Sequence, residues 1–267
     1  VGFLVPKQGV RKQMLDNAFI DATDYLEKHA GREKIKQDMT AGAVDGLQQK
    51  LKLNKRPHIM ECYDISNISG TDKVASMVVF VEGEADKSRY RRFRIKTVEG
   101  ADDFKSMNEV ISRRLQRLKD NDEKFGEMPD LIVIDGGKGQ LSSAYQAMNQ
   151  LGLNIDMISI AEQEEEIFLI GQSSPVILDK TSWELKLVQR IRDEAHRFAI
   201  TYHKSLREKH IVSELLNIEG VGKKRAEALY KHFLTIEDIK RADVDKLSEI
   251  KGISRTAAQK IYDYFHG

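Results

Sequence analysis

Two aspartates occupy positions that suit metal-dependent chemistry. Asp64 lies in the run 61–67, and Asp135 ends the apolar run 130–135, directly before a glycine-rich loop at 136–139. If the two runs are neighbouring strands, both carboxylates reach one edge of a sheet, where open α/β sheets hold their ligands. Adjacent carboxylates repel each other unless a cation lies between them, and Mg²⁺ or Mn²⁺ is the simplest candidate. The alternative interpretation is that each aspartate is an ordinary turn or cap residue.

One histidine has neighbours that suit proton transfer. His196 lies on a predicted helix, with Arg192 one turn before it and Asp193 placed to orient its ring. Because the pKa of histidine lies near neutrality, His196 is a candidate acid–base group. A solvated helical residue is the alternative interpretation, and His203, also at helical spacing, is a second candidate.

The glycine-rich loop after Asp135 is a weak signal for nucleotide binding. Gly137 and Gly139 resemble the start of a dinucleotide-binding fingerprint, but Ser142 stands where the third glycine belongs. The loop also lacks the Gly-Lys-Ser/Thr sequence of a P-loop. The pattern favours a tight turn between a strand and a helix, for which glycine supplies the backbone freedom.

Residues 87–96 hold six cations and no acid, with aromatic residues between them. In a strand, alternation would separate the side chains into two faces, with Arg92, Arg94 and Lys96 on one and Arg91, Phe93 and Ile95 on the other. Such a cationic strip can hold a phosphate backbone. It can equally protect an edge strand from aggregation.

A short unit occurs twice after residue 208. Residues 215–229 are echoed at 247–261. In the first copy a glycine turn before a helix directs free backbone N–H groups and the positive end of the helix dipole to one place. Helix-hairpin-helix motifs grip a nucleic-acid backbone in this way without reading its bases. The second copy is weaker, because Ser254 replaces the final glycine, but it keeps Arg255 and Thr256. The residues that we predict to bind DNA are Gly220, Gly222, Lys223, Lys224, Arg225, Gly252, Arg255 and Thr256.

Hydrophobic periodicity predicts the elements that position these residues. Predicted strands cover residues 59–65, 74–81, 90–95, 130–135, 157–160 and 166–170. Predicted helices cover residues 14–53, with a break at 30–32, then 102–118, 139–151 and 182–206. The first three strands should form an antiparallel meander, and residues 130–135 should form a central strand buried on both faces.

The element pattern predicts three parts of the chain. A mixed α/β domain should cover residues 57–207, after an N-terminal helical segment at 1–56 and before the hairpin domain at 208–267. The link at 208–213 contains no Pro or Gly, so it is either a continuous helix or a hinge.

Composition excludes several classes of protein. The chain has 267 residues, 40% of them hydrophobic, with 43 Lys+Arg against 42 Asp+Glu. This composition is globular rather than disordered, and no apolar run approaches the ~18–20 residues of a membrane helix. Cys62 is the single cysteine, so a cytoplasmic location is expected. Near-neutral charge leaves nucleic acid open as a partner, because phosphates respond to the local distribution of Lys and Arg.

Together, these motifs closely resemble the C-terminal half of the UvrC family, the incision subunit of bacterial nucleotide excision repair. The matching segments are Glu61-Cys62-Tyr63-Asp64-Ile65-Ser66-Asn67, Asp102-Asp103-Phe104 with Met107-Asn108, Ile134-Asp135-Gly136-Gly137-Lys138-Gly139-Gln140, Ile191-Arg192-Asp193-Glu194-Ala195-His196, and the doubled hairpin. They cover nearly the whole chain in the family's order. The resemblance implies a ribonuclease H-like mixed sheet flanked by helices, followed by a small all-α tandem helix-hairpin-helix domain.

The resemblance also implies an activity and a site. The family's C-terminal half makes the incision on the 5′ side of a lesion. Asp64, Asp135 and His196 match its catalytic triad, and Asp103, or Asp102 beside it, matches a further acidic position. We therefore hypothesise that Asp64 and Asp135 hold Mg²⁺ or Mn²⁺, while His196 transfers a proton or positions the nucleophile.

Partners follow from the same resemblance. Lys138 and Arg192 are candidate phosphate clamps, and the hairpins would hold damaged or junction-containing DNA. In the family, UvrB marks the damaged site, but its binding segment, the N-terminal nuclease domain and the cysteine cluster are not recognisable here. With Val1 at its start, the chain is expected to be a fragment that makes one of the two cuts. No membrane partner is expected.

Two other functional classes stay open from the sequence. The ribonuclease H-like fold also carries ATP-dependent phosphotransferases, in which the loop at 136–139 would bind nucleotide. A non-catalytic DNA scaffold with an inactive sheet domain is the second alternative. Saturable ATP binding would favour the first alternative, and an absence of metal-dependent nicking would favour the second.

Overall fold

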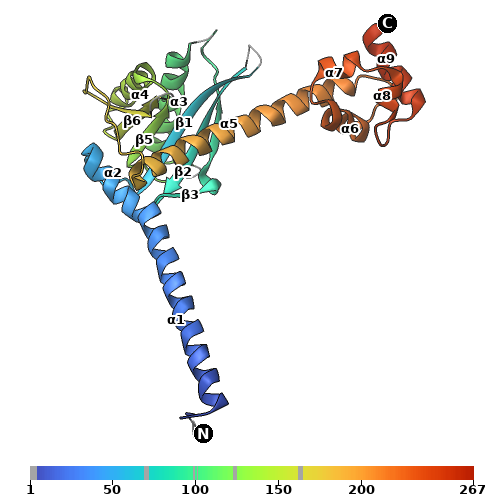
Figure 1. The fold of residues 1–267 in the computed structure, drawn as a ribbon. Coiled ribbons are helices and arrows are strands. Elements are labelled where there is room, and N and C mark those ends of the chain that lie inside the picture. Colours follow the sequence, from blue (N-terminus) through green and yellow to red (C-terminus); the bar gives the residue numbers. More distant parts are fainter. Residues whose placement is uncertain (1–4, 69–71, 99, 101, 123–124, 162–164) are drawn as a thin grey trace. The chain divides into compact units, whose positions relative to one another are not determined.

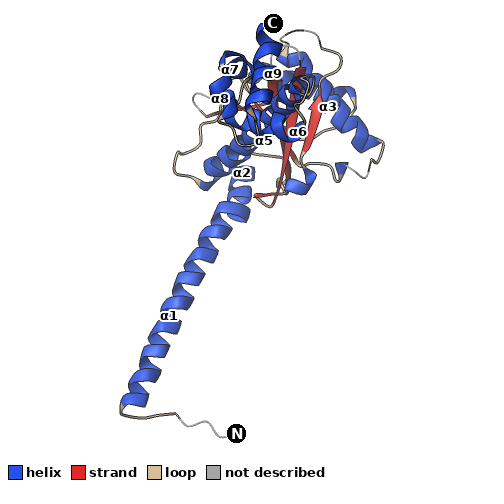
Figure 2. Ribbon diagram, turned by 90° about the vertical axis from the view of Figure 1, so that its right-hand side faces the viewer, coloured by secondary structure: helices blue, strands red, loops and turns tan. Residues whose placement is uncertain are grey.

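The computed structural model describes residues 5–68, 72–98, 100, 102–122, 125–161 and 165–267. The chain divides into two compact units, Val1–His196 and Arg197–Gly267. The first unit contains a mixed sheet between helices, and the second is built from helices (Figure 1 and Figure 2). None of the helices in these described ranges is long and apolar enough to cross a membrane.

The N-terminal segment is a nearly unbroken helix. α1 spans Val10–Gln37, a short π-helix spans Asp38–Gly42, and α2 spans Ala43–Leu51. The predicted break at residues 30–32 is wrong, because α1 continues through Gly31. A glycine inside a helix costs only about 1 kcal/mol relative to alanine and, unlike proline, keeps its backbone hydrogen bonds. The side chains of α1 are largely exposed, whereas α2 buries its apolar face.

The first unit is organised around a sheet of seven described strands. They are β1 (Ile59–Ile68), β2 (Asp72–Val81), β3 (Glu84–Ala85), β4 (Arg91–Arg94), β5 (Leu131–Asp135), β6 (Asp156–Ala161) and β7 (Glu166–Leu169). Their order is β3-β2-β1-β5-β6-β7, and β4 also pairs with β2. β1, β5 and β6 are parallel, and the remaining pairs are antiparallel. The predicted meander is confirmed, with the short β3 as an addition.

Side chains of the sheet alternate between two helical layers. α3 (Asp103–Lys119) and α4 (Lys138–Gln150) pack on one face in a shared apolar core. The first part of α5 (Trp183–Leu215) crosses the other face, as Figure 1 shows. Burial on both faces explains the unbroken apolar run of β5. The helices predicted at 102–118 and 139–151 are confirmed, and the one predicted at 182–206 extends to Leu215.

A buried ion pair fastens α3 to β1. Arg114 is 0% exposed and Glu61 2% exposed, and Arg114 Nη2 donates to Glu61 Oε1 at 2.5 Å. Tyr63 Oη donates to Glu61 Oε2 at 2.5 Å, and Arg114 also donates to the Phe125 carbonyl at 2.9 Å. Burial disfavours the charged guanidinium, but the Glu61 carboxylate outweighs this effect and holds the pKa of Arg114 above its ordinary value. The network therefore holds α3 in one position against the sheet face that lies opposite α5.

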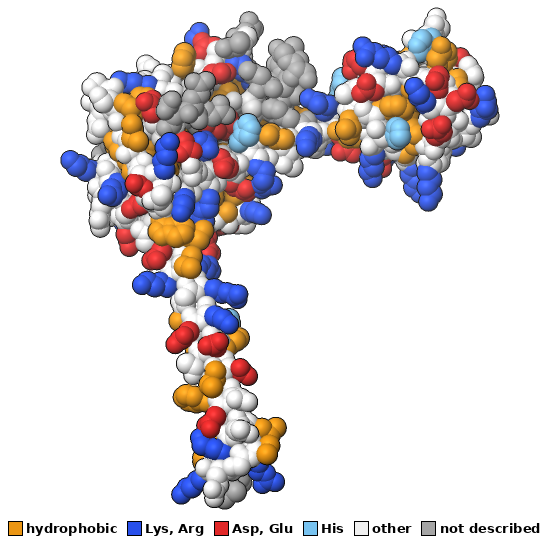
Figure 3. Space-filling model, viewed as in Figure 1, with side chains coloured by type: hydrophobic (Ala, Val, Ile, Leu, Met, Phe, Trp, Pro, Cys, Tyr) orange, Lys and Arg blue, Asp and Glu red, His pale blue; other side chains and the backbone are white. Residues whose placement is uncertain are grey.

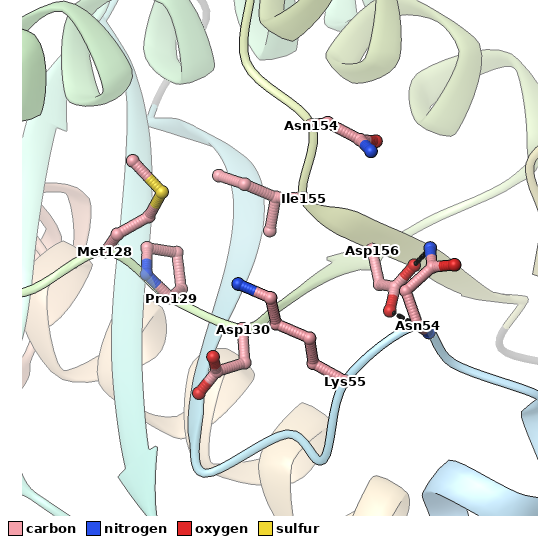
Figure 4. Close-up of a pocket in the computed structure, with 8 residues that line it drawn as sticks. All are labelled: Asn54, Lys55, Met128, Pro129, Asp130, Asn154, Ile155 and Asp156. Carbon is pink, nitrogen blue, oxygen red and sulfur yellow. Dashed lines mark hydrogen bonds between the residues drawn. The ribbon is translucent and has the colours of Figure 1, made fainter.

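Polar pairs at the far end of the parallel strands fix their register. Asn54 donates to Asp156 from its backbone N–H at 2.7 Å and from its side chain at 2.6 Å (Figure 4). The backbone N–H of Ile59 donates to Asp130 Oδ2 at 2.9 Å. Asn54, Asp130 and Asp156 line a pocket of about 270 Å³ where β5 and β6 begin. Because these aspartates already accept bonds that hold strands in place, the pocket has a structural role.

The second unit is the predicted doubled hairpin. Its helices are α6 (Lys223–Phe233), α7 (Ile236–Arg241), α8 (Val244–Ser248) and α9 (Arg255–His266). They enclose an apolar core that includes Ile218, Leu229, Leu247 and Ile261. Residues 208–213 lie inside α5, so the link predicted as either a helix or a hinge is a continuous helix.

Candidate active site

The parallel pairing of β1 and β5 brings the two predicted aspartates together. Asp64 is directly opposite Asp135 in the register, and α5 places His196 beside them. One ligand atom from each of the three residues lies within 4.8 Å of the other two. Asp64 is only 7% exposed, Asp135 is half-buried and His196 is exposed. We call this group the acid cluster.

The donors of the acid cluster suit a divalent cation. Asp64 and Asp135 offer carboxylate oxygens, the ligands that Mg²⁺ and Mn²⁺ take in proteins. The imidazole of His196 is close enough to serve as a third ligand, although imidazole is more typical of later transition metals. The chemistry of the set therefore fits a metal held by the two carboxylates, with His196 available as a ligand or as an acid–base group.

The pKa shifts of neighbouring groups indicate that the electrostatic potential at the acid cluster is negative. Burial raises the pKa of the Cys62 thiol well above its ordinary value, and the charges of Asp135 and Asp64 raise it further. Burial disfavours the charge of Arg192, but its hydrogen bond to Asp193 and the charges of Asp193 and Asp135 outweigh this and raise its pKa. The raised pKa keeps Cys62 a neutral thiol. The negative potential favours binding of a cation at the acid cluster.

The two predicted phosphate clamps lie on different helices. Arg192 of α5 has a side chain that is 16% exposed, and its Nη2 donates to Asp193 Oδ1 at 2.9 Å. Asp193, which we expected to orient the ring of His196, thus accepts from Arg192. Lys138 is the first residue of α4 and is exposed, with Nζ 3.5 Å from the carbonyl oxygen of Ser173. The phosphate-binding roles of both residues stay predictions.

Asp103 lies outside the acid cluster. It opens α3, where Asp102 caps the helix by accepting from the Lys105 N–H at 2.9 Å. Lys73 Nζ donates to Asp103 Oδ1 at 3.0 Å. Asp103 therefore neutralises a cation of β2, and its catalytic role stays a prediction. The side chain of the other candidate, His203, lies outside the described part of the structure.

Sequence reasoning missed two contacts in this region. Lys73 is buried at the start of β2, directly after Asp72, and no local pattern marks it as buried. Tyr90 Oη donates to Glu194 Oε1 at 2.9 Å, which joins the segment before β4 to α5. The second contact links residues far apart in the chain, so no local pattern announces it.

The hairpins have the backbone geometry that the repeat predicts. Gly220 and Gly252 have φ angles of 82° and 96°, in the left-handed region that favours glycine. α6 begins after Gly222 and α9 begins after Ser254, whose hydroxyl accepts from the Ala257 N–H at 3.3 Å. Each turn therefore leads directly into the N-terminus of a helix.

The cations of the hairpins differ in what they contact. Lys223 and Lys224 are exposed at the start of α6. Arg255 Nη2 lies 3.1 Å from Asp245 Oδ1, and Thr256 is exposed on the next position of α9.

Arg225 joins the two hairpin turns. Its Nη1 donates to the Gly220 carbonyl at 2.6 Å, and its Nε donates to the Gly252 carbonyl at 3.1 Å. The structure thus engages the predicted DNA-binding Arg225 in holding the two glycine turns together. The equivalent residue in the second copy of the repeat is Ala257, so the arginine of this link comes from the first copy.

The fold and the acid cluster define a class of protein. A mixed sheet in which Asp64 within β1 pairs with Asp135 at the end of the parallel β5, with a helical histidine beside them, is a ribonuclease H-like nuclease architecture. Residues 48–200 match the family described as the UvrC RNAse H endonuclease domain. Residues 212–266 match a SAM-like helix-hairpin-helix tandem. The chain therefore belongs to the UvrC RNAse H endonuclease domain family.

Curated relatives match along nearly the entire chain. UvrABC system protein C of Chlorobaculum tepidum is 42% identical over 271 residues, covering 100% of this chain and 42% of the relative. The protein of the same name from Porphyromonas gingivalis is 44% identical over 264 residues, covering 97% and 43%. That of Lachnospira eligens is 42% identical over 276 residues, covering 100% and 45%. The chain spans less than half the length of these relatives.

Solved structures give weaker similarities. Endonuclease V of Ciona intestinalis in complex with inosine-containing DNA aligns with a TM-score of 0.39 and 11% identity, covering 67% of this chain and 98% of that one. Human ENDOV aligns with a TM-score of 0.35 and 11% identity, covering 56% and 85%.

Proposed function

We propose that this protein is a divalent-metal-dependent DNA endonuclease that makes the 5′ incision beside a lesion in nucleotide excision repair. The observation that carries the proposal is the convergence of Asp64, Asp135 and His196 within 4.8 Å in a member of the UvrC RNAse H endonuclease domain family. The name of the relatives, UvrABC system protein C, supports the repair context.

The residues of the acid cluster divide the chemistry between them. When bound by Asp64 and Asp135, a Mg²⁺ or Mn²⁺ ion supplies Lewis acidity to the scissile phosphate and lowers the pKa of a bound water. The pairing of β1 with β5 holds the two carboxylates in place before substrate arrives. His196, at the exposed side of the cluster, exchanges a proton with the attacking water or the leaving oxygen. Arg192 and Lys138 bind the non-reacting phosphate oxygens.

The second unit supplies affinity for DNA in this proposal. Backbone N–H groups at the starts of α6 and α9, together with Lys223, Lys224, Arg255 and Thr256, bind phosphates without selecting a sequence. The substrate is damaged or junction-containing DNA. UvrB is the proposed partner, and the proposed location is the cytoplasm.

Nicking of DNA by variants of the acid cluster tests the function. We expect Asp64→Asn and Asp135→Asn to lose at least about 10²-fold in rate, because a catalytic metal contributes several kcal/mol of transition-state stabilisation. His196→Ala should lose about 10²–10⁴-fold, as expected for an acid–base group. The measurement is the conversion of lesion-containing DNA to nicked product with Mg²⁺ or Mn²⁺, alone and with UvrB.

The control for these variants is Asp16→Asn, which removes an exposed carboxylate of α1. It should nick at the wild-type rate. Wild-type nicking by Asp135→Asn would refute the site, and wild-type nicking in excess EDTA would refute the dependence on metal.

A further inference from the structure

A basic edge strand shares the sheet face of the acid cluster. In the register, Ser76 of β2 pairs with Asp64 of β1 on one side and with Arg92 of β4 on the other. Directly opposed residues of neighbouring strands point to the same face of a sheet. Arg92 therefore lies on the face of Asp64, two strands away, which is about 10 Å at the usual strand spacing. Arg94, opposite Val74, shares this face.

A contact with α5 identifies the same face independently. Tyr90 directly precedes β4 with an extended backbone, so alternation places it on the face of Arg92. The Tyr90 hydroxyl donates to Glu194 Oε1 at 2.9 Å, and Glu194 lies two residues before His196 on α5. Figure 3 shows this unit from the α5 side, with Lys and Arg side chains gathered beside the helix and acidic side chains among them. The start of β4 is thus fastened to the helix that carries the histidine of the acid cluster.

Other cations of the strip at 87–96 belong to different surroundings. Arg91 lies on the opposite face, with its guanidinium carbon 5.8 Å from the centroid of the Phe125 ring. Lys96, which we expected to continue the row, lies beyond the end of β4, and its backbone N–H donates to Glu109 of α3 at 3.0 Å. Lys96 is therefore not part of β4, where we predicted it beside Arg92 and Arg94. Arg92 and Arg94 are both exposed.

We propose that Arg92 and Arg94 bind phosphates of the DNA strand that is cut, beside the acid cluster. The proposal rests on the endonuclease function proposed above and adds a substrate-binding site to it. A guanidinium presents paired N–H donors that match phosphate oxygens. The two residues lie about 7 Å apart along the strand and can hold neighbouring phosphates. Cations on the face of the acid cluster offset its repulsion of a polyanion and so help to hold the backbone there.

Protection of an edge strand against aggregation is the alternative role for these arginines. That role needs charge at the edge but does not distinguish the two faces of the sheet. Arg91 would then serve as well as Arg92, its neighbour on the same strand. Phosphate binding, in contrast, requires the face of the acid cluster, which makes Arg91→Gln a matched control for the loss of one charge.

The salt dependence of DNA binding tests the site. Binding of duplex DNA to the 267-residue protein is measured without divalent metal at several KCl concentrations, for wild type, R91Q, R92Q and R94Q. Each phosphate contact contributes about 0.9 to the slope of log K against log salt. We expect R92Q and R94Q each to lose about that much slope, and R91Q to keep the wild-type slope. The charge-preserving R92K should also keep it. Thermal unfolding shows that each variant is folded.

Each outcome decides between the roles. A wild-type slope in folded R92Q and R94Q overturns the proposal, and aggregation alone in these variants assigns the strip to edge protection. Equal slope losses in R91Q, R92Q and R94Q also overturn it. The endonuclease function is judged separately by nicking. If wild type nicks while the slopes are unchanged, only the phosphate site fails. If the slopes fall as expected but wild type never nicks, only the endonuclease function fails.

Discussion

At the scale of single residues, the two faces of β1 carry buried carboxylates in different surroundings. On the α5 face, Asp64 lies beside a second carboxylate, and the pKa of Cys62 is raised by burial and then by the charges of Asp135 and Asp64. On the α3 face, Glu61 is fully engaged by Arg114 and Tyr63. The first arrangement sets two carboxylates side by side, as in a site for a divalent cation, whereas the second pairs one carboxylate with a cation of the chain. The carboxylate of the acid cluster and the carboxylate of the stabilising network thus lie three positions apart on β1 and on opposite faces of the sheet.

Replacement of Arg114 by methionine tests the stabilising half of this arrangement. R114M leaves the Glu61 carboxylate buried without its cation, and breaking a buried pair in this way costs about 3–5 kcal/mol. We expect the free energy of unfolding, measured in urea, to fall by that amount. The control is R117M, whose side chain is 49% exposed and pairs with Asp122, and whose loss should be below about 1 kcal/mol.

The double variant E61L/R114M sharpens the R114M experiment. Removing both charges leaves neither ion buried alone, so the double variant should be more stable than R114M. If R114M unfolds within about 1 kcal/mol of wild type, the network does not hold α3 to the sheet.

At the scale of elements, local sequence patterns predict some features of the helices and strands but not others. The buried run of β5 and the alternation of β4 are periodic signals, so a central strand and a two-faced strip could be predicted. The continuity of α1 through Gly31 could not, because a tolerated glycine and a helix-ending glycine look alike in sequence. Nor could the register of β1 against β5, which is supported by contacts such as that of Ile59 with Asp130, 71 residues apart.

The link between the hairpin turns gives a prediction at this scale. Arg225→Gln removes the donors that hold the carbonyls of Gly220 and Gly252, which costs about 1–3 kcal/mol in the stability of the second unit. With the turns no longer held together, DNA binding should weaken by the same factor at every salt concentration. The measurements are thermal unfolding and a salt titration of binding. Loss of about 0.9 in the salt slope with unchanged stability would instead place Arg225 on a phosphate.

At the scale of the whole molecule, a net charge of +1 conceals opposed local fields. Carboxylates gather at the acid cluster, while cations gather on β4 and at the start of α6. The convergence of Asp64, Asp135 and His196 could be predicted because Asp135 follows a buried apolar run and the family's motifs contain all three residues. The assignment of Arg92 and Arg94 to its face could not, because alternation within β4 says nothing about which helix covers that face. Only the pairing through Ser76 and the contact of Tyr90 with Glu194 settle it.

Because DNA binding and cutting are assigned to different units, we predict that each can be impaired without the other. K223Q/K224Q neutralises the exposed cations at the start of α6, so we expect weaker DNA binding and a salt slope smaller by about 1.8. Nicking at saturating DNA should stay at the wild-type rate, because the acid cluster belongs to the other unit. The matched control, K231Q/K246Q, removes the same charge from exposed positions away from the starts of α6 and α9. Equal weakening by both variants would show a general charge effect, and a wild-type slope in K223Q/K224Q would remove these lysines from the DNA interface.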